Sequence, residues 1–147
     1  MTPVAAESPR PAGDLNGPRR VLHAFVVEDN PVILENLVAA LEELTSVQVV
    51  GHAADEESAL AQLAARRGEL DLVIVDVFLK SGSGLGVLRG ALSTSLPAPR
   101  VVLTNCVSVE VLAQCRALGA DCVFDKSKDL DELMAYCCRL AERGAQR

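Results

Sequence analysis

Aromatic residues are scarce in this chain, which contains three Phe, one Tyr and no Trp among 147 residues. Half of the residues are nevertheless hydrophobic, which excludes a chain that is disordered throughout. The core must then consist mainly of Val, Leu, Ile and Ala, a composition that suits strands packed beneath amphipathic helices. The length is that of one ordinary domain with a hydrophobic core.

Positive charge is also in deficit, since 14 Lys and Arg stand against 20 Asp and Glu and the formal net charge is -6. No cluster of Lys and Arg stands out, and a nucleic-acid-binding face needs one to neutralise phosphates. We therefore expect no direct contact with nucleic acid.

Long apolar runs are missing as well. No run reaches the length of a transmembrane helix, and the N-terminus lacks the basic-then-apolar order of a signal peptide. We expect no membrane insertion and a cytoplasmic location. The odd number of cysteines and the lack of a C-x-x-C pair favour reduced thiols over disulfides or a zinc site.

The change in composition along the chain predicts one folded domain with a short segment at each end. Residues 1–20 are rich in Pro and Gly without apolar periodicity, which is typical of a flexible leader. The globular domain is expected over 21–143, with 144–147 as a C-terminal tail.

Five short apolar runs in the folded unit predict β-strands, each followed by a helical pattern. The strands are expected at 21–27, 47–50, 72–75, 101–103 and 122–124. The first helical stripe is Leu34, Leu37, Val38 and Leu41, with Pro31 at the start of the helix. Five β-α repeats predict a doubly wound parallel sheet with helices on both faces and right-handed crossovers.

Polar residues follow four of these strands: Glu28 and Asp29, then Asp76, Thr104 and Lys126. In a parallel sheet the carboxyl ends share one edge, where ligands bind in folds of this kind. Taken singly, each residue has an ordinary explanation, such as an acidic residue favouring a helix dipole or a lysine exposed to solvent.

Together these residues indicate a more specific chemistry. Three carboxylates at one edge repel one another unless a divalent cation lies among them, and an all-oxygen ligand set favours Mg²⁺. The hydroxyl of Thr104 and the ammonium of Lys126 would then suit an anion such as phosphate. A carboxylate in this setting is a plausible phosphoryl acceptor.

Four segments at the strand ends resemble the signatures of two-component receiver domains, in the same order and on the corresponding strands. They are 26–30 (VVEDN), 73–77 (VIVDV), 102–105 (VLTN) and 124–127 (FDKS). The resemblance covers roughly residues 21–143. It implies a flavodoxin-like sheet with strand order 2-1-3-4-5 and five helices.

The resemblance also implies roles for individual residues. Asp76 would be the phosphorylated residue. Asp29 and Asp76 would bind Mg²⁺ directly, Glu28 would bind it through water, and the backbone carbonyl of Phe78 would complete the protein ligands. Of the two remaining site residues, Thr104 would be the hydroxyl that senses the phosphoryl group and Lys126 the lysine that pairs with it.

A chain of this family would be a stand-alone response regulator, not an enzyme beyond catalysing its own phosphorylation and dephosphorylation. A histidine kinase or a histidine phosphotransfer protein would donate the phosphoryl group. Output would pass to a downstream protein target or through a homodimer.

The chain departs from the family at Val123, where an aromatic residue is common, at Asn105, where a small residue is common, and at Ser127, where proline is common. Val123 and Asn105 leave open a pseudo-receiver that keeps the fold without turning over phosphate, although Asp29, Asp76, Thr104 and Lys126 argue against it. A magnesium-dependent phosphohydrolase with an aspartate nucleophile is the other alternative, but the D-x-D pattern of haloacid-dehalogenase-like enzymes is not matched after the first strand.

Overall fold

The computed structural model of the chain describes residues 20–105 and 107–145. Nearly all of the expected leader and residues 146–147 of the expected tail lie outside the described residues, as does Cys106.

Strands and helices alternate along the described chain, as the apolar pattern predicts. The strands are β1 (Leu22–Val27), β2 (Val47–Ala53), β3 (Leu72–Val75), β4 (Arg100–Thr104) and β5 (Cys122–Asp125). The helices are α2 (Pro31–Leu44), α3 (Glu56–Ala65), α4 (Gly84–Ser93), α5 (Val109–Ala117) and α6 (Leu130–Ala145).

The helices begin where side chains satisfy free backbone amides. The Asn30 side chain accepts hydrogen bonds from the N–H groups of Val32 and Ile33 at the start of α2. The Asp55 carboxylate caps α3 in the same way by accepting from the Ser58 N–H at 2.8 Å. Such caps fix where each loop after a strand ends and its helix begins.

The last helix, α6, begins directly after Asp129. The Asp129 carboxylate accepts a hydrogen bond from the backbone N–H of Asp125 at 2.9 Å. The Asp129 carbonyl accepts from the N–H of Leu133 at 3.0 Å. The side chain of Asp129 therefore ties α6 to the end of β5.

All strand pairs are parallel, and the order β2-β1-β3-β4-β5 confirms the expected doubly wound sheet. Strand β2 is longer than predicted, because Gly51 pairs with Phe25 and the strand continues to Ala53. A Cβ at Gly51 would lie 3.1 Å from the Phe25 ring, so the glycine leaves room for that ring inside the strand.

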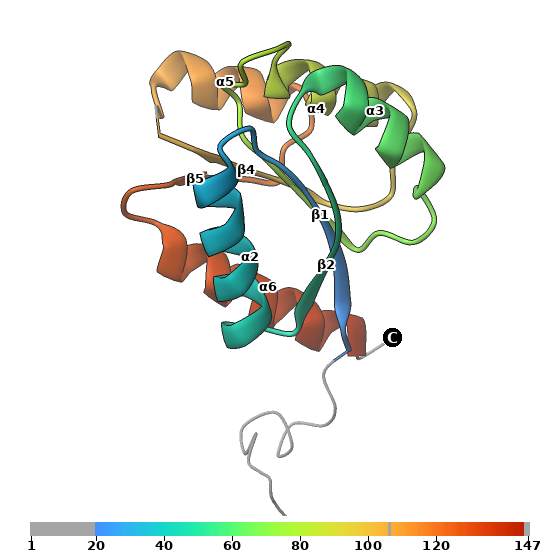
Figure 1. The fold of residues 1–147 in the computed structure, drawn as a ribbon, viewed down its shortest axis with the longest axis vertical. Helices are drawn as coiled ribbons and strands as arrows, with labels where there is room; N and C mark the ends of the chain where they lie inside the picture. The colour runs from blue at the N-terminus through green and yellow to red at the C-terminus, as the bar shows by residue number, and fades with distance from the viewer. Residues whose placement is uncertain (1–19, 106, 146–147) are drawn as a thin grey trace, which may run out of the picture.

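Two apolar clusters, one on each face of the sheet, form the core. Helices α3, α4 and α5 cover one face, where Leu63, Leu88 and Cys115 are buried. Helices α2 and α6 cover the other face, where Leu41 and Leu133 are buried. Figure 1 shows this arrangement, with α2 and α6 together on one side and the other three helices across the sheet.

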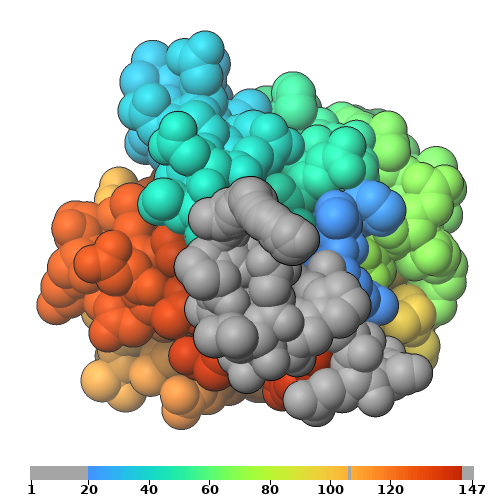
Figure 2. Space-filling model, turned by 90° about the horizontal axis from the view of Figure 1, so that it is seen from below, coloured from blue at the N-terminus to red at the C-terminus, as the bar shows by residue number. Residues whose placement is uncertain are grey.

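Figure 2 shows the end of the molecule at which β1 starts. The first residues of β1 (blue) reach the surface there beside residues of β2 (teal). Arg20 pairs with Asp71, which also accepts a hydrogen bond from the His23 N–H at 2.8 Å. The candidate site lies at the other ends of the strands.

No helix within residues 20–105 and 107–145 has both the length and the apolar character to cross a membrane.

Truncating Leu133 should test whether α6 is held by core packing. Its side chain is fully buried, so Leu133→Ala should lower the free energy of unfolding by about 2–5 kcal/mol through lost contacts and a cavity. The exposed residue Arg139 on the same helix provides a control, and Arg139→Ala should stay within about 0.5 kcal/mol. Urea unfolding measures both, and equal effects would contradict this packing.

Candidate functional site

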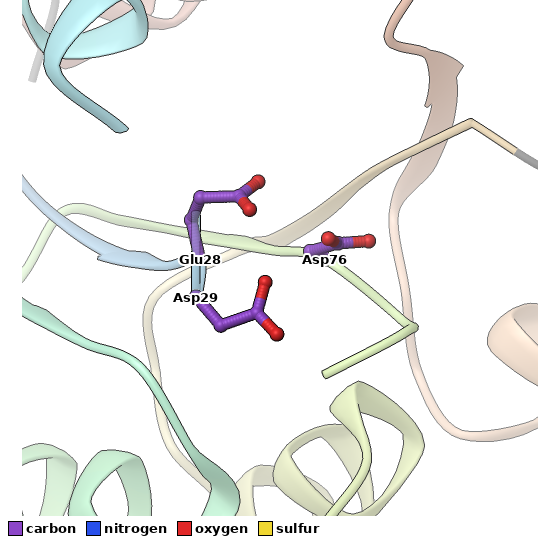
Figure 3. A group of neighbouring side chains, drawn as sticks. All are labelled: Glu28, Asp29 and Asp76. Atoms are coloured by element: carbon purple, nitrogen blue, oxygen red, sulfur yellow. The ribbon is translucent and has the colours of Figure 1, made fainter. Parts of the chain in front are cut away.

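Three carboxylates converge where β1 and β3 end. Glu28 and Asp29 follow β1, Asp76 follows β3, and one oxygen from each lies within 4.8 Å of the others. Figure 3 shows the three side chains facing a common space. Glu28 is only 4% exposed and Asp76 only 6%, so these charges are largely removed from water. An oxygen-only group of this kind suits Mg²⁺.

Backbone hydrogen bonds set the positions of these residues. The Glu28 N–H donates to the Ala53 carbonyl and the Asp76 N–H donates to the Val27 carbonyl, each at 3.0 Å. The sheet ladder therefore continues one residue into the site. The cluster owes its geometry to the parallel pairing of β3, β1 and β2.

Lys126 is the cation of the cluster. Its Nζ lies 2.9 Å from Asp76 Oδ2 and 2.5 Å from Glu28 Oε1, and the side chain is only 10% exposed. Burial alone would lower the pKa of Lys126, but hydrogen bonds and charges from Glu28 and Asp76 outweigh it and raise the pKa above its ordinary value. Lys126 is therefore held charged between two buried carboxylates.

The turn that carries Lys126 is closed by Ser127. Its hydroxyl and its backbone N–H both donate to Asp125 Oδ1, at 2.5 and 2.7 Å. These hydrogen bonds hold the pKa of Asp125 below its ordinary value. Ser127 thus shapes the turn by hydrogen bonding, at a position where receiver domains commonly have proline.

Thr104 ends β4, the strand between β3 and β5. The residue is fully buried, and its carbonyl accepts from the Lys126 N–H at 3.0 Å. Its Oγ1 is buried without a hydrogen-bond partner among the described residues. Such a hydroxyl is costly to leave unsatisfied, so it is ready to bond a group that enters the site.

Phe78 lies two residues past Asp76, in the loop before α4. Its N–H donates to Asp76 Oδ1 at 3.3 Å, and the residue is 54% exposed. Phe78 and Ser83 form an isolated antiparallel bridge across this loop. The Phe78 backbone therefore lies beside the Asp76 carboxylate.

Two backbone features of the site escaped the sequence analysis. The first is the Lys80 N–H, which donates to Asp29 Oδ2 at 2.6 Å. Nothing in the sequence indicates that Lys80 belongs to the site. The second feature is Gly84, where a Cβ would lie 2.1 Å from the Asp76 carbonyl oxygen. Glycine is therefore needed where α4 starts against the backbone of Asp76.

Comparison with known proteins places this arrangement among signalling domains. A family model described as response regulator receiver domain matches residues 24–137. The transcriptional regulatory protein CitB of Klebsiella pneumoniae is 33% identical over 101 residues, which are 69% of this chain and 41% of CitB. The DNA-binding transcriptional activator DevR/DosR of Mycobacterium tuberculosis is 30% identical over 100 residues, which are 68% of this chain and 45% of that protein.

The chain thus spans less than half the length of these two relatives. Among solved structures, the phosphorylated cyanobacterial phytochrome response regulator RcpA matches with a TM-score of 0.69 and 26% identity. That match covers 84% of this chain and 93% of RcpA.

Replacing Lys126 by methionine should destabilise the metal-free protein at neutral pH. Lys126→Met leaves Glu28 and Asp76 buried without their cation, which should lower the free energy of unfolding by about 3 kcal/mol. Lys128→Met, at an exposed position nearby, should change little.

The difference in stability between wild type and Lys126→Met should depend on pH in one direction only. Because the folded-state pKa of Lys126 is raised above 10.5, its stabilising contribution is complete below pH 10.5 and is lost as pH rises through the folded-state pKa. The stability gap between wild type and Lys126→Met, measured by urea unfolding, should therefore narrow only above pH 10.5. A gap that closes near neutral pH would contradict the ion pairs.

Proposed function

The chain belongs to the response regulator receiver domain family of two-component systems, and from this premise we propose that it accepts a phosphoryl group on Asp76 with the help of Mg²⁺. One observation carries the proposal: a buried Asp76 carboxylate bonded to Lys126 at 2.9 Å, with Glu28 and Asp29 beside it. The phosphorylated state named for the similar regulator RcpA supports it.

Mg²⁺ would be held directly by Asp29 and Asp76, through water by Glu28, and by the backbone carbonyl of Phe78. The ligand set fits this ion because every donor is an oxygen and the three carboxylates already lie within 4.8 Å. When bound, the ion would neutralise negative charge that accumulates between the carboxylates and a phosphoryl group.

The transfer requires a nucleophilic oxygen on Asp76. One carboxylate oxygen forms a bond to phosphorus while the P–N bond of a donor phosphohistidine breaks. The electron pair of that bond stays on the imidazole nitrogen, which then takes a proton from water. The Phe78 N–H, 3.3 Å from Asp76 Oδ1, helps to orient the carboxylate.

Lys126 changes partners in this proposal. In the present structure it neutralises Glu28 and Asp76, and after transfer its ammonium would pair with a phosphoryl oxygen. The phosphoryl group would place negative charge close to where the Asp76 carboxylate now has it. Lys126 would therefore need to move only slightly.

Thr104 would report the phosphoryl group to the surface. Its unpartnered Oγ1 would donate a hydrogen bond to a phosphoryl oxygen, drawing the end of β4 and the segment before α5 toward the site. Val123 is only partly buried against the core and offers no aromatic ring to follow this movement. The response would therefore depend on β4 and α5.

The partners proposed follow from the chemistry and the family. Response regulators interact with histidine kinases, so the donor would be such a kinase or a histidine phosphotransfer protein. Output would go to a protein target or a second copy of the chain. CitB and DevR/DosR carry names of transcriptional regulators, and we propose no nucleic-acid contact for the domain described here.

Removing Asp29 should weaken Mg²⁺ binding. Asp29→Ala deletes a direct ligand and should raise the Mg²⁺ dissociation constant by at least about tenfold, since even indirect ligand partners have effects of that size. Glu43→Ala removes an exposed carboxylate elsewhere and serves as the control. Titration calorimetry measures both, and an unchanged affinity in Asp29→Ala would show that Asp29 does not bind Mg²⁺.

Phosphorylation itself is tested by incubation with acetyl phosphate and Mg²⁺. Intact-mass analysis should find one added phosphoryl group that is labile to alkali and hydroxylamine, as an acyl phosphate is. Asp76→Asn should take no label because a neutral amide is a poor nucleophile. If wild type takes no label from acetyl phosphate or from kinases, the pseudo-receiver becomes the better description. If Asp76→Asn labels as well as wild type, the acceptor is another residue.

A further inference from the structure

Glu56 reaches out of its own helix to the loop that follows Asp76. It is the first residue of α3, directly after the N-cap Asp55. Its Oε1 accepts a hydrogen bond from the Ser83 N–H at 2.9 Å. Its backbone N–H donates to the Ser81 carbonyl at 3.3 Å. The half-buried Glu56 therefore holds the end of this loop with both side chain and backbone.

The glycines opposite Glu56 leave room for its side chain. A Cβ at Gly86, in the first turn of α4, would lie 2.2 Å from Glu56 Oε2. A Cβ at Gly82 would lie 2.5 Å from the Glu56 Cβ, and Gly82 has φ of +77°. Any larger residue at either position would push Glu56 away, so the loop and the glutamate fit together only as they stand.

The same loop supplies backbone groups to the site. The Lys80 N–H holds Asp29 at 2.6 Å, and the Phe78 N–H holds Asp76 at 3.3 Å. The loop starts where β3 ends. Its two ends are joined by the Gly84 N–H, which donates to the Val77 carbonyl at 2.9 Å. From the α3 side, Glu56 holds it at Ser81 and Ser83.

Glu56 also complements the charge of the helix that it contacts. Ser83 is the N-cap of α4, and its hydroxyl accepts from the Leu85 N–H at 3.0 Å. The Glu56 carboxylate lies against this N-terminus, where the helix dipole favours negative charge. A charged hydrogen bond to the N-cap N–H fixes the loop more firmly than a neutral one would.

We propose that Glu56 is a positioning residue for phosphoryl transfer at Asp76. It holds residues 77–83 so that the Lys80 amide orients the Asp29 carboxylate and the Phe78 backbone stays beside Asp76. This inference rests on the proposed function, because the groups it positions are the proposed Mg²⁺ ligands.

The test compares Glu56→Ala and Glu56→Gln with Glu57→Ala, an exposed neighbour on α3. In metal-free protein, Glu56→Ala should speed hydrogen exchange of the Lys80 and Ser83 amides by about tenfold. With Mg²⁺, it should weaken binding by about tenfold and slow labelling by acetyl phosphate. Glu56→Gln should recover part of each effect because its amide oxygen can still accept from Ser83, and Glu57→Ala should match wild type.

A second variant tests the contact from the other side and does not depend on removing Glu56. Gly86→Ala should disturb Lys80 exchange and Mg²⁺ affinity in the same direction, because its Cβ displaces the Glu56 carboxylate. In a Glu56→Ala background, Gly86→Ala should have no further effect. Effects that add in full across the double variant would overturn the proposal.

The outcomes separate this inference from the function on which it rests. If wild type binds Mg²⁺ and takes label but Glu56→Ala matches it in both, Glu56 is structural only and the inference is overturned. Unchanged Lys80 exchange in Glu56→Ala overturns it as well. Failure of wild type to bind Mg²⁺ or take label would overturn the proposed function, and with it the role in transfer, whatever the Lys80 amide does.

Discussion

Glu28, Asp29 and Asp76 repel one another, and the other groups of the site are arranged so that they offset this repulsion. The sheet ladder forces these carboxylates together, and two of them are nearly buried. In the present structure Lys126 offsets the charge of Glu28 and Asp76, while the Lys80 N–H donates a hydrogen bond to the Asp29 carboxylate. In the proposed function, a bound cation would offset the remaining negative charge, and an anion would then bind beside it.

The fold explains why the compensating groups come from distant parts of the sequence. Parallel strands bring their carboxyl ends to one edge, so β5 can deliver Lys126 to carboxylates that follow β1 and β3. The buried hydroxyl of Thr104 reaches the same edge from β4. The core on both faces of the sheet holds these ends in register, and the loop after β3 adds the N–H groups of Phe78 and Lys80 that hydrogen-bond Asp76 and Asp29.

The sequence predicted the five strands, their helices and the convergence of the polar strand ends, because these follow from hydrophobic period and parallel topology. It missed the extension of β2 through Gly51, since a glycine inside a strand looks like its end. It also missed the contacts of Glu56 with Ser83 and of Lys80 with Asp29, which join residues 27 and 51 positions apart through a backbone N–H. Any residue except proline can supply such an amide, so the residue type gives no signal.

Chemical trapping can locate the phosphoryl group that we propose on Asp76. Borohydride reduces an acyl phosphate to an alcohol, so labelled protein treated with it should contain homoserine in place of one aspartate. Peptide mass spectrometry of wild-type protein labelled by acetyl phosphate should find that homoserine at position 76 and nowhere else. Homoserine at position 29, or no reduced residue in protein that carries the label, would show that Asp76 does not carry the phosphoryl group.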